Sequence, residues 1–240
     1  MSVLQTIDIA KQYLKRKVVD GISLNVETGQ IVGMLGPNGA GKTTSFYMIA
    51  GFIRPDRGQV ILNGEDITTL PINKRALKGI SYLAQDSSVF KKLTVEENVR
   101  IVLEPLGLSR KKIKEKIEEL FSELKIGYLA NNKAHSLSGG ERRRVEIMRA
   151  LATNPRFILL DEPFAGIDPL AVADLQQIIL DLKERGLGVL ISDHNVRETL
   201  AVCDNAYIVS NGKILTKGPA EEIINSKEAR RSYLGENFKM

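Results

Sequence analysis

The sequence is poor in the features that mark secreted and membrane-spanning proteins. Among its 240 residues there is one cysteine, Cys203, and no tryptophan, so an internal disulfide framework is excluded. No apolar run approaches the roughly 18 residues that a bilayer-crossing helix needs. The N-terminus carries an acidic side chain early and lacks the apolar core of a signal peptide. From these absences we expect a cytoplasmic protein with a reduced cysteine.

The charge balance is mildly basic. Lys and Arg total 34 against 29 Asp and Glu, which gives a net charge of +5. Such an excess fits a protein that binds nucleic acid, one that binds anionic lipid, or one that binds nucleotides on a basic face. The positive residues are spread along the chain rather than clustered, and this favours the third interpretation.

Strand and helix patterns alternate along the chain. Residues 30–35, 157–160 and 188–192 are short, continuously apolar runs, which are typical of buried parallel strands. A helical pattern over 171–183 separates the last two runs. This strand–helix–strand order predicts an α/β fold with a parallel sheet.

Three other segments have different patterns. Residues 1–35 alternate short strands with polar turns. From Ser87 to about Leu129 the pattern becomes helical, with apolar residues at spacings of three and four and with Lys and Glu on the other face. Near the C-terminus, Asn211 and Gly212 lie between two apolar segments and predict a β-hairpin.

The most informative stretch is a complete phosphate-binding loop of the form G-x-x-x-x-G-K-T. Its glycines let backbone N–H groups approach a polyphosphate. Lys42 supplies positive charge for the β- and γ-phosphates, and Thr43 offers a hydroxyl to Mg²⁺. A strand precedes the loop and a helix over 43–49 follows it, so that the helix N-terminus faces the phosphates. The predicted ATP-binding residues of this stretch are Gly36, Pro37, Asn38, Gly39, Ala40, Gly41, Lys42, Thr43 and Thr44.

Two adjacent carboxylates, Asp161 and Glu162, follow the apolar run 157–160. Ligands of parallel sheets bind at the carboxyl ends of the strands, which is where these acids lie. An Asp-Glu pair alone usually just ends a strand, but beside a phosphate loop it suits ATP hydrolysis. Asp161 is then the candidate to hold Mg²⁺, and Glu162 is the candidate general base that polarises the attacking water.

Ser138, Gly139 and Gly140 precede a predicted helix over 142–151. The serine hydroxyl and the glycine amides form a second anion-binding helix N-terminus. Ser138 and Glu141 also match a capping box, and one helix can serve both purposes. A second phosphate site is of little use to one nucleotide unless it serves the nucleotide of another subunit.

The run 137–141, Leu-Ser-Gly-Gly-Glu, lies between a phosphate loop and the run Ile-Leu-Leu-Asp-Glu-Pro, and in this order it resembles the ABC ATPases. The resemblance covers nearly the whole chain. It implies that Gln85 senses Mg²⁺ and nucleotide, that His194 contacts the γ-phosphate and that Tyr13 stacks on adenine. Taken singly, each of these three residues would more often be structural.

The resemblance also implies a fold. It is a P-loop NTPase with a RecA-like parallel-sheet core, an N-terminal antiparallel β subdomain and a helical subdomain inserted at roughly 87–150. The whole chain, 1–240, is then a single ATPase domain that ends in a short tail over 220–240.

The cofactors implied by the resemblance are ATP and Mg²⁺, and the assembly is a head-to-tail homodimer. Ser138, Gly139 and Gly140 of one copy then complete the nucleotide site of the other. The segment after Gln85 is expected to contact two integral inner-membrane subunits, with Phe90 and Lys91 as contacts. For Phe90, burial within the helical subdomain is an equally weighted alternative.

Longer runs are similar to the ATPases of bacterial lipopolysaccharide exporters, including 161–169, 192–203 and the tail 233–238. This similarity implies an ATP-hydrolysing transporter subunit, peripheral on the cytoplasmic face of the inner membrane. It implies no nucleic acid and no direct contact with the lipid substrate. The ATPases of branched-chain amino acid importers share much of the pattern. A soluble ABC ATPase acting on nucleic acid or the ribosome is a further alternative, although that class usually carries two ATPase units or a long coiled coil.

Overall fold

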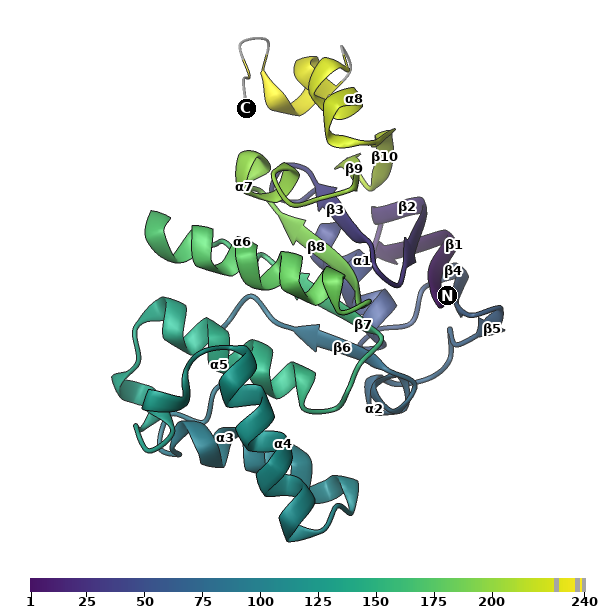
Figure 1. Cartoon of the computed structure of the whole chain (residues 1–240). Coiled ribbons are helices and arrows are strands. Elements are labelled where there is room, and N and C mark those ends of the chain that lie inside the picture. Colours follow the sequence, from purple (N-terminus) through teal and green to yellow (C-terminus); the bar gives the residue numbers. More distant parts are fainter. Residues whose placement is uncertain (227–228, 236–237, 239–240) are drawn as a thin grey trace.

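The computed structural model describes residues 1–226, 229–235 and 238, and within them the chain forms two β-sheets with helices around them (Figure 1). The strands, in chain order, are β1 (Val3–Tyr13), β2 (Arg16–Glu27), β3 (Ile31–Leu35), β4 (Arg57–Leu62), β5 (Glu65–Asp66), β6 (Ile80–Leu83), β7 (Phe157–Asp161), β8 (Gly188–Asp193), β9 (Asn205–Ser210) and β10 (Lys213–Gly218). The helices are α1 (Lys42–Ala50), α2 (Ile72–Leu77), α3 (Val95–Leu103), α4 (Arg110–Glu123), α5 (Gly139–Leu151), α6 (Pro169–Glu184), α7 (Val196–Leu200), α8 (Ala220–Asn225) and the short π-helix η4 (Arg230–Leu234). Single 3-10 turns lie at Glu104–Leu106, Gly127–Leu129 and Ala134–Ser136.

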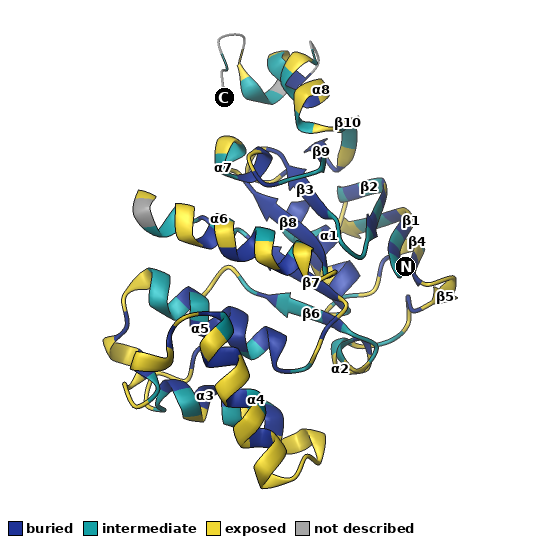
Figure 2. Ribbon diagram, viewed as in Figure 1, coloured by how far each residue is buried: buried dark blue, intermediate teal, exposed yellow. Residues whose placement is uncertain are grey.

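The larger sheet has the strand order β10-β9-β3-β8-β7-β6. From β9 to β6 every neighbouring pair is parallel, and β10 pairs antiparallel with β9. Every residue of β3, β7 and β8 is buried, because helices cover both faces of the sheet (Figure 2). The parallel sheet predicted from the apolar runs is therefore confirmed. The predicted hairpin is confirmed too, with Asn211 and Gly212 at φ 48° and 76° in its turn.

The smaller sheet, β2-β1-β4-β5, is antiparallel and comes from the first part of the chain. Its apolar side chains pack against α1, and the opposite side of α1 packs against the larger sheet. Phe46 of α1 is fully buried in this cluster, which also contains Leu4 of β1 and Leu159 of β7. The helix that follows the phosphate-binding loop is thus clamped between the two sheets, which fixes the loop in space.

Helices α3, α4 and α5 gather at one end of the molecule, away from the antiparallel sheet (Figure 1). They share a core with α6 and with the face of β7 that carries Ile158 and Leu160. The expectation of a helical region from Ser87 is wrong at its start. Residues 87–94 form no helix, because Thr94 caps α3 through a reciprocal capping box with Glu97.

The last part of the chain packs on the outside of the larger sheet. Ile223 of α8 and Ala229 form a small core with Leu200 and Ile208, and Tyr233 lies against it. Of the tail over 233–238, residues 236 and 237 lie outside the described residues. None of the helices in the described part of the chain has both the length and the apolarity to cross a bilayer.

Arg75 of α2 is a buried cation that donates hydrogen bonds to the C-terminus of α1, the helix after the phosphate-binding loop. It is 1% exposed. Its Nη1 donates to the carbonyls of Met48 and Ile49 at 2.7 and 2.6 Å, which are C-terminal groups of α1. Its Nε and Nη2 donate to the carbonyls of Leu70 and Thr68, each at 2.9 Å. Burial lowers the pKa of Arg75 to about 10, and the four acceptors compensate for the lost water.

We predict that Arg75→Met lowers the free energy of unfolding by about 3 kcal/mol, because it leaves four carbonyl groups without this donor. The measurement is urea denaturation followed by circular dichroism. Arg57→Met is the matched control, since that side chain is 60% exposed and its ion pairs are surface pairs worth under about 1 kcal/mol. Equal losses in the two variants would contradict the role assigned to Arg75.

Candidate functional site

The phosphate-binding loop connects β3 to α1 and is shaped by close backbone packing. A Cβ atom at Gly36 would lie 2.1 Å from the Val209 carbonyl oxygen. Gly41 has φ 105°, and a Cβ atom there would lie 2.6 Å from the Val18 carbonyl oxygen. Both positions therefore need glycine. Because no side chain caps α1, its first N–H groups are left for an anion, as the sequence predicts.

Lys42 is the first residue of α1 and is 5% exposed. Its ammonium group donates to the carbonyl oxygens of Gly36 and Pro37 at 2.7 and 3.2 Å. Burial lowers the pKa of Lys42, and the negative charges of nearby Glu162, Asp193 and Asp161 act in the opposite direction. The lysine therefore lies between the loop and the carboxylates that end β7 and β8.

Asp161 ends β7 and is 1% exposed. Its Oδ1 accepts a hydrogen bond from the hydroxyl of Ser192 on β8, and its Oδ2 accepts one from the hydroxyl of Tyr82 on β6 at 3.1 Å. Burial and the Asp161 charge raise the pKa of the Tyr82 phenol well above its usual value, so the phenol keeps the proton that it donates. Both hydroxyl donors are neutral.

Glu162 follows β7 directly, and its backbone is in an unusual conformation. Its φ is 45°, a region that costs a non-glycine residue of order 1–3 kcal/mol and that is found preferentially at functional sites. Its N–H donates to the Ser192 carbonyl oxygen at 2.7 Å, which holds this conformation. Its Oε2 lies 2.9 Å from the amide nitrogen of Gln85 and 3.2 Å from Nδ1 of His194. Three residues predicted from separate motifs thus meet at one carboxylate oxygen.

Asp193, at the end of β8, organises the loop that carries His194, a role that sequence reasoning missed. Its carboxylate is fully buried. Oδ1 accepts from the N–H groups of His194 and Asn195 at 2.7 and 2.8 Å, and Oδ2 accepts from that of Phe164 at 3.1 Å. Burial raises the pKa of Asp193, and these three backbone donors act against the rise. The signal in the sequence was the acidic residue directly before the predicted switch histidine.

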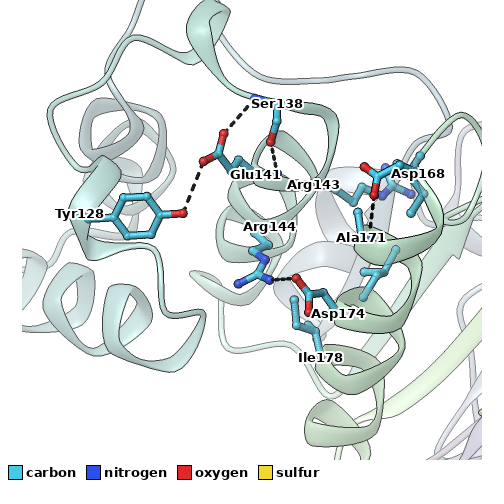
Figure 3. Close-up of a pocket in the computed structure, with 12 residues that line it drawn as sticks. Tyr128, Ser138, Glu141, Arg143, Arg144, Asp168, Ala171, Asp174 and Ile178 are labelled. Carbon is cyan, nitrogen blue, oxygen red and sulfur yellow. Dashed lines mark hydrogen bonds and ion pairs between the residues drawn. The ribbon is translucent and has the colours of Figure 1, made fainter.

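Ser138 caps α5, and its capping box with Glu141 is present in both directions. This N-terminus lines a cavity of about 220 Å³ together with residues of α6. Figure 3 shows Ser138 of α5 and Asp168, Ala171 and Asp174 around it. Tyr128, which also lines the cavity, donates to Glu141 at 3.4 Å, and Asp168, another lining residue, caps α6. Ser138 and Gly140 line this cavity, and Gly139 lines a neighbouring pocket with Gln85 and Glu162; among the described residues, none of the phosphate loop lines either pocket.

The remaining predicted contacts lie on the surface. Tyr13 ends β1 and is 47% exposed, with the Lys11 ammonium 5.9 Å from its ring centroid. Phe90 is 46% exposed and lies under the Arg149 guanidinium, whose central carbon is 5.0 Å from the ring centroid. Burial of Phe90 inside the helical region is thereby excluded. Lys91 next to it is exposed as well, and its carbonyl oxygen contacts Nδ1 of His135 at 3.2 Å.

Comparison with known proteins gives a family. The family model described as "ABC transporter" matches residues 19–165. The chain is 55% identical to the lipopolysaccharide export system ATP-binding protein LptB of Haemophilus influenzae and 52% identical to that of Escherichia coli K12. Each alignment covers all of this chain and all of the relative. A solved ATP-binding cassette of an ABC transporter, in its ADP conformation, superimposes with a TM-score of 0.88 at 33% identity, covering 98% of this chain and all of the other.

The matches to the two relatives and to the solved cassette extend over the whole constellation described above, and the family model covers it from the phosphate loop to Glu162. The P-loop NTPase fold expected from the sequence is confirmed by the same comparisons. The chain belongs to the ABC transporter family, as one of its ATP-binding and ATP-hydrolysing subunits.

Proposed function

We propose that this chain hydrolyses ATP to drive lipopolysaccharide out of the inner membrane towards the outer membrane. The observation that carries this proposal is the identity of 55% and 52%, over full length, to proteins named as ATP-binding subunits of lipopolysaccharide export systems. Neither the importer alternative nor the nucleic-acid alternative has an observation of comparable weight. The chain would lie on the cytoplasmic face of the inner membrane and dock onto two integral membrane subunits. Exposed Phe90 and Lys91 are the proposed contacts.

The nucleotide would bind between two copies of the chain. Lys42, Thr43 and the N-terminus of α1 supply one half of the site, and Ser138 to Gly140 of the other copy supply the second half. The proposal is supported by the placement of Ser138 on a cavity that the phosphate loop does not line. Tyr13 is exposed enough to stack on an adenine ring.

Glu162 is the proposed general base. It sits at a strained turn with its carboxylate oxygen held between Gln85 and His194, so its position is set before water arrives. Lys42 and the α1 amides offset the charge that develops on the phosphate oxygens during transfer. His194, whose Nδ1 lies 3.2 Å from the same carboxylate, is the proposed contact of the γ-phosphate.

The residues present fit Mg²⁺. Thr43 and Asp161 offer a hydroxyl and a carboxylate, which are the oxygen ligands this ion prefers. The hydrogen-bond partners of the buried Asp161 carboxylate are neutral hydroxyls, and a divalent cation would compensate its charge. When bound with ATP, Mg²⁺ neutralises charge on the β- and γ-phosphates. Gln85, the third proposed ligand, donates its amide hydrogen to Glu162 in this structure and would have to turn.

We predict that Glu162→Gln lowers the steady-state ATPase rate by at least about 100-fold, because an amide cannot accept the proton from water. ATP affinity is expected to stay near the wild-type value, and ATP should trap a dimer detectable by gel filtration. Glu118→Gln is the control, because that side chain is 65% exposed on α4. A wild-type rate in Glu162→Gln would remove this residue from the proposed role.

If each nucleotide site is built from two copies of the chain, two variants that are inactive alone should restore activity when they are mixed. Lys42→Ala damages the phosphate-loop half of the site, and Ser138→Asp keeps a good helix cap but places negative charge against the phosphates. Each variant alone is expected to be inactive. In an equimolar mixture about half of the dimers pair the two variants, and each mixed dimer keeps one intact site of two, so about a quarter of the wild-type rate should return. A mixture as inactive as its components would rule out sites built from two copies.

A further inference from the structure

The Asp161 carboxylate is held from both sides by hydroxyl groups of neighbouring strands. Ser192 on β8 is paired in register with Asp161, and its hydroxyl donates to Oδ1. Tyr82 on β6 is paired with Leu159, two residues earlier on β7, and its longer side chain reaches Oδ2 at 3.1 Å. Side chains two residues apart on a strand share a face, so all these groups lie on the face that α1 covers.

The Tyr82 ring is itself held in one orientation by aromatic neighbours. Phe52 meets it edge-on with ring centroids 5.1 Å apart, and Tyr47 does so at 6.1 Å. Tyr47 belongs to α1, the helix that begins with Lys42 and Thr43, and Phe52 follows the end of that helix. The helix that carries the proposed phosphate and metal contacts therefore also packs against the tyrosine that holds Asp161.

The two hydroxyl donors leave the carboxylate free to bind further ligands. An ionised carboxylate has about four lone-pair sites, and the two hydrogen bonds use one on each oxygen. A phenylalanine would fill the same space in the aromatic cluster, so the hydroxyl is not needed for packing. The hydroxyl donates to the carboxylate, and Tyr47 is the other side chain that interacts with it.

We propose that Tyr82 is a positioning residue for magnesium-dependent nucleotide binding, in which its phenol holds the Asp161 carboxylate in the orientation that receives the ion. The inference rests on the proposed metal role of Asp161. Hydrogen-bonding partners that orient a metal-binding carboxylate contribute to metal affinity without touching the metal. Tyr82 acts in this way from the edge strand of the sheet, through one hydrogen bond.

The test is the affinity of the whole chain for ADP, measured by calorimetry once in excess Mg²⁺ and once in EDTA. The ratio of the two affinities is the magnesium-dependent gain. In Tyr82→Phe we expect this gain to fall about tenfold, with the affinity in EDTA unchanged. A general loss of structure would instead lower both affinities, so the ratio separates positioning from folding. Mn²⁺ binding in the presence of ADP, followed by the free-ion electron paramagnetic resonance signal, should weaken in parallel.

Tyr207→Phe is the matched control, because it also removes a buried phenol that takes part in a hydrogen bond, here from the Asn25 N–H at 3.2 Å. It lies in the same apolar cluster, but within the described part of the chain its hydroxyl is hydrogen-bonded to the Asn25 N–H and not to Asp161, so it should keep the wild-type gain. Asp161→Asn is the second reference and should lose the gain.

The outcomes separate the two proposals. A wild-type gain in Tyr82→Phe together with a lost gain in Asp161→Asn overturns the inference and leaves the metal role of Asp161 standing. A wild-type gain in Asp161→Asn overturns both. An equal loss in Tyr82→Phe and Tyr207→Phe also overturns the inference, because the effect would then not depend on Asp161.

Discussion

The site depends on the concentration of charge at the carboxyl ends of β7 and β8. Asp161 and Asp193 end these two strands and Glu162 follows Asp161 directly, and Lys42 faces them from the start of α1. Opposite charges that are shielded from water attract each other strongly. The Lys42 ammonium group nevertheless donates its hydrogen bonds to carbonyl oxygens of its own loop. The loop glycines make that possible, because the backbone at Gly36 and Gly41 passes too close to its neighbours for any side chain. The phosphate-binding loop is therefore already shaped, with the Lys42 ammonium group in place, before nucleotide binds.

Each acid at this edge is held by a different kind of partner, and the partner matches its role. Asp193 is held by three backbone N–H groups and shapes the histidine loop. Asp161 is held by two side-chain hydroxyls, which are neutral and orient it without neutralising its charge themselves. Glu162 is held by two side chains from loops, Gln85 and His194, on a strained backbone. Contacts from loops are the easiest of the three to rearrange, so the proposed base is also the acid that a change in loop position can release.

Most of the fold and the inner part of the site could be predicted from the sequence, because their signals are local. The apolar runs at 157–160 and 188–192, the phosphate loop and the capping box at Ser138 each lie within about ten residues of chain. Tyr82 and Ser192 were missed because their roles depend on which residues of neighbouring strands face each other, whereas Asp193 bonds mainly to the next two residues and had a local signal. That register is set by the packing of crossover helices on the sheet, and no short stretch of sequence records it. The start of α3 was missed for a simpler reason, since the Thr94 and Glu97 capping pair lies inside a region whose apolar spacing looks continuous.

The separation of Ser138 from the phosphate loop has a consequence for how binding energy is used. An N-terminus that caps itself with Ser138 and Glu141 is stable without a ligand, so it needs no nucleotide to fold. The same holds for the phosphate loop, which is clamped between two sheets. In the proposed two-copy site, neither half would gain much by ordering itself around ATP, and the free energy of binding would be available for bringing two copies together. Hydrolysis would then remove the γ-phosphate contact to both halves, and the preformed halves would separate without unfolding. In that proposal, rigidity within each copy is what allows the nucleotide to control the distance between copies.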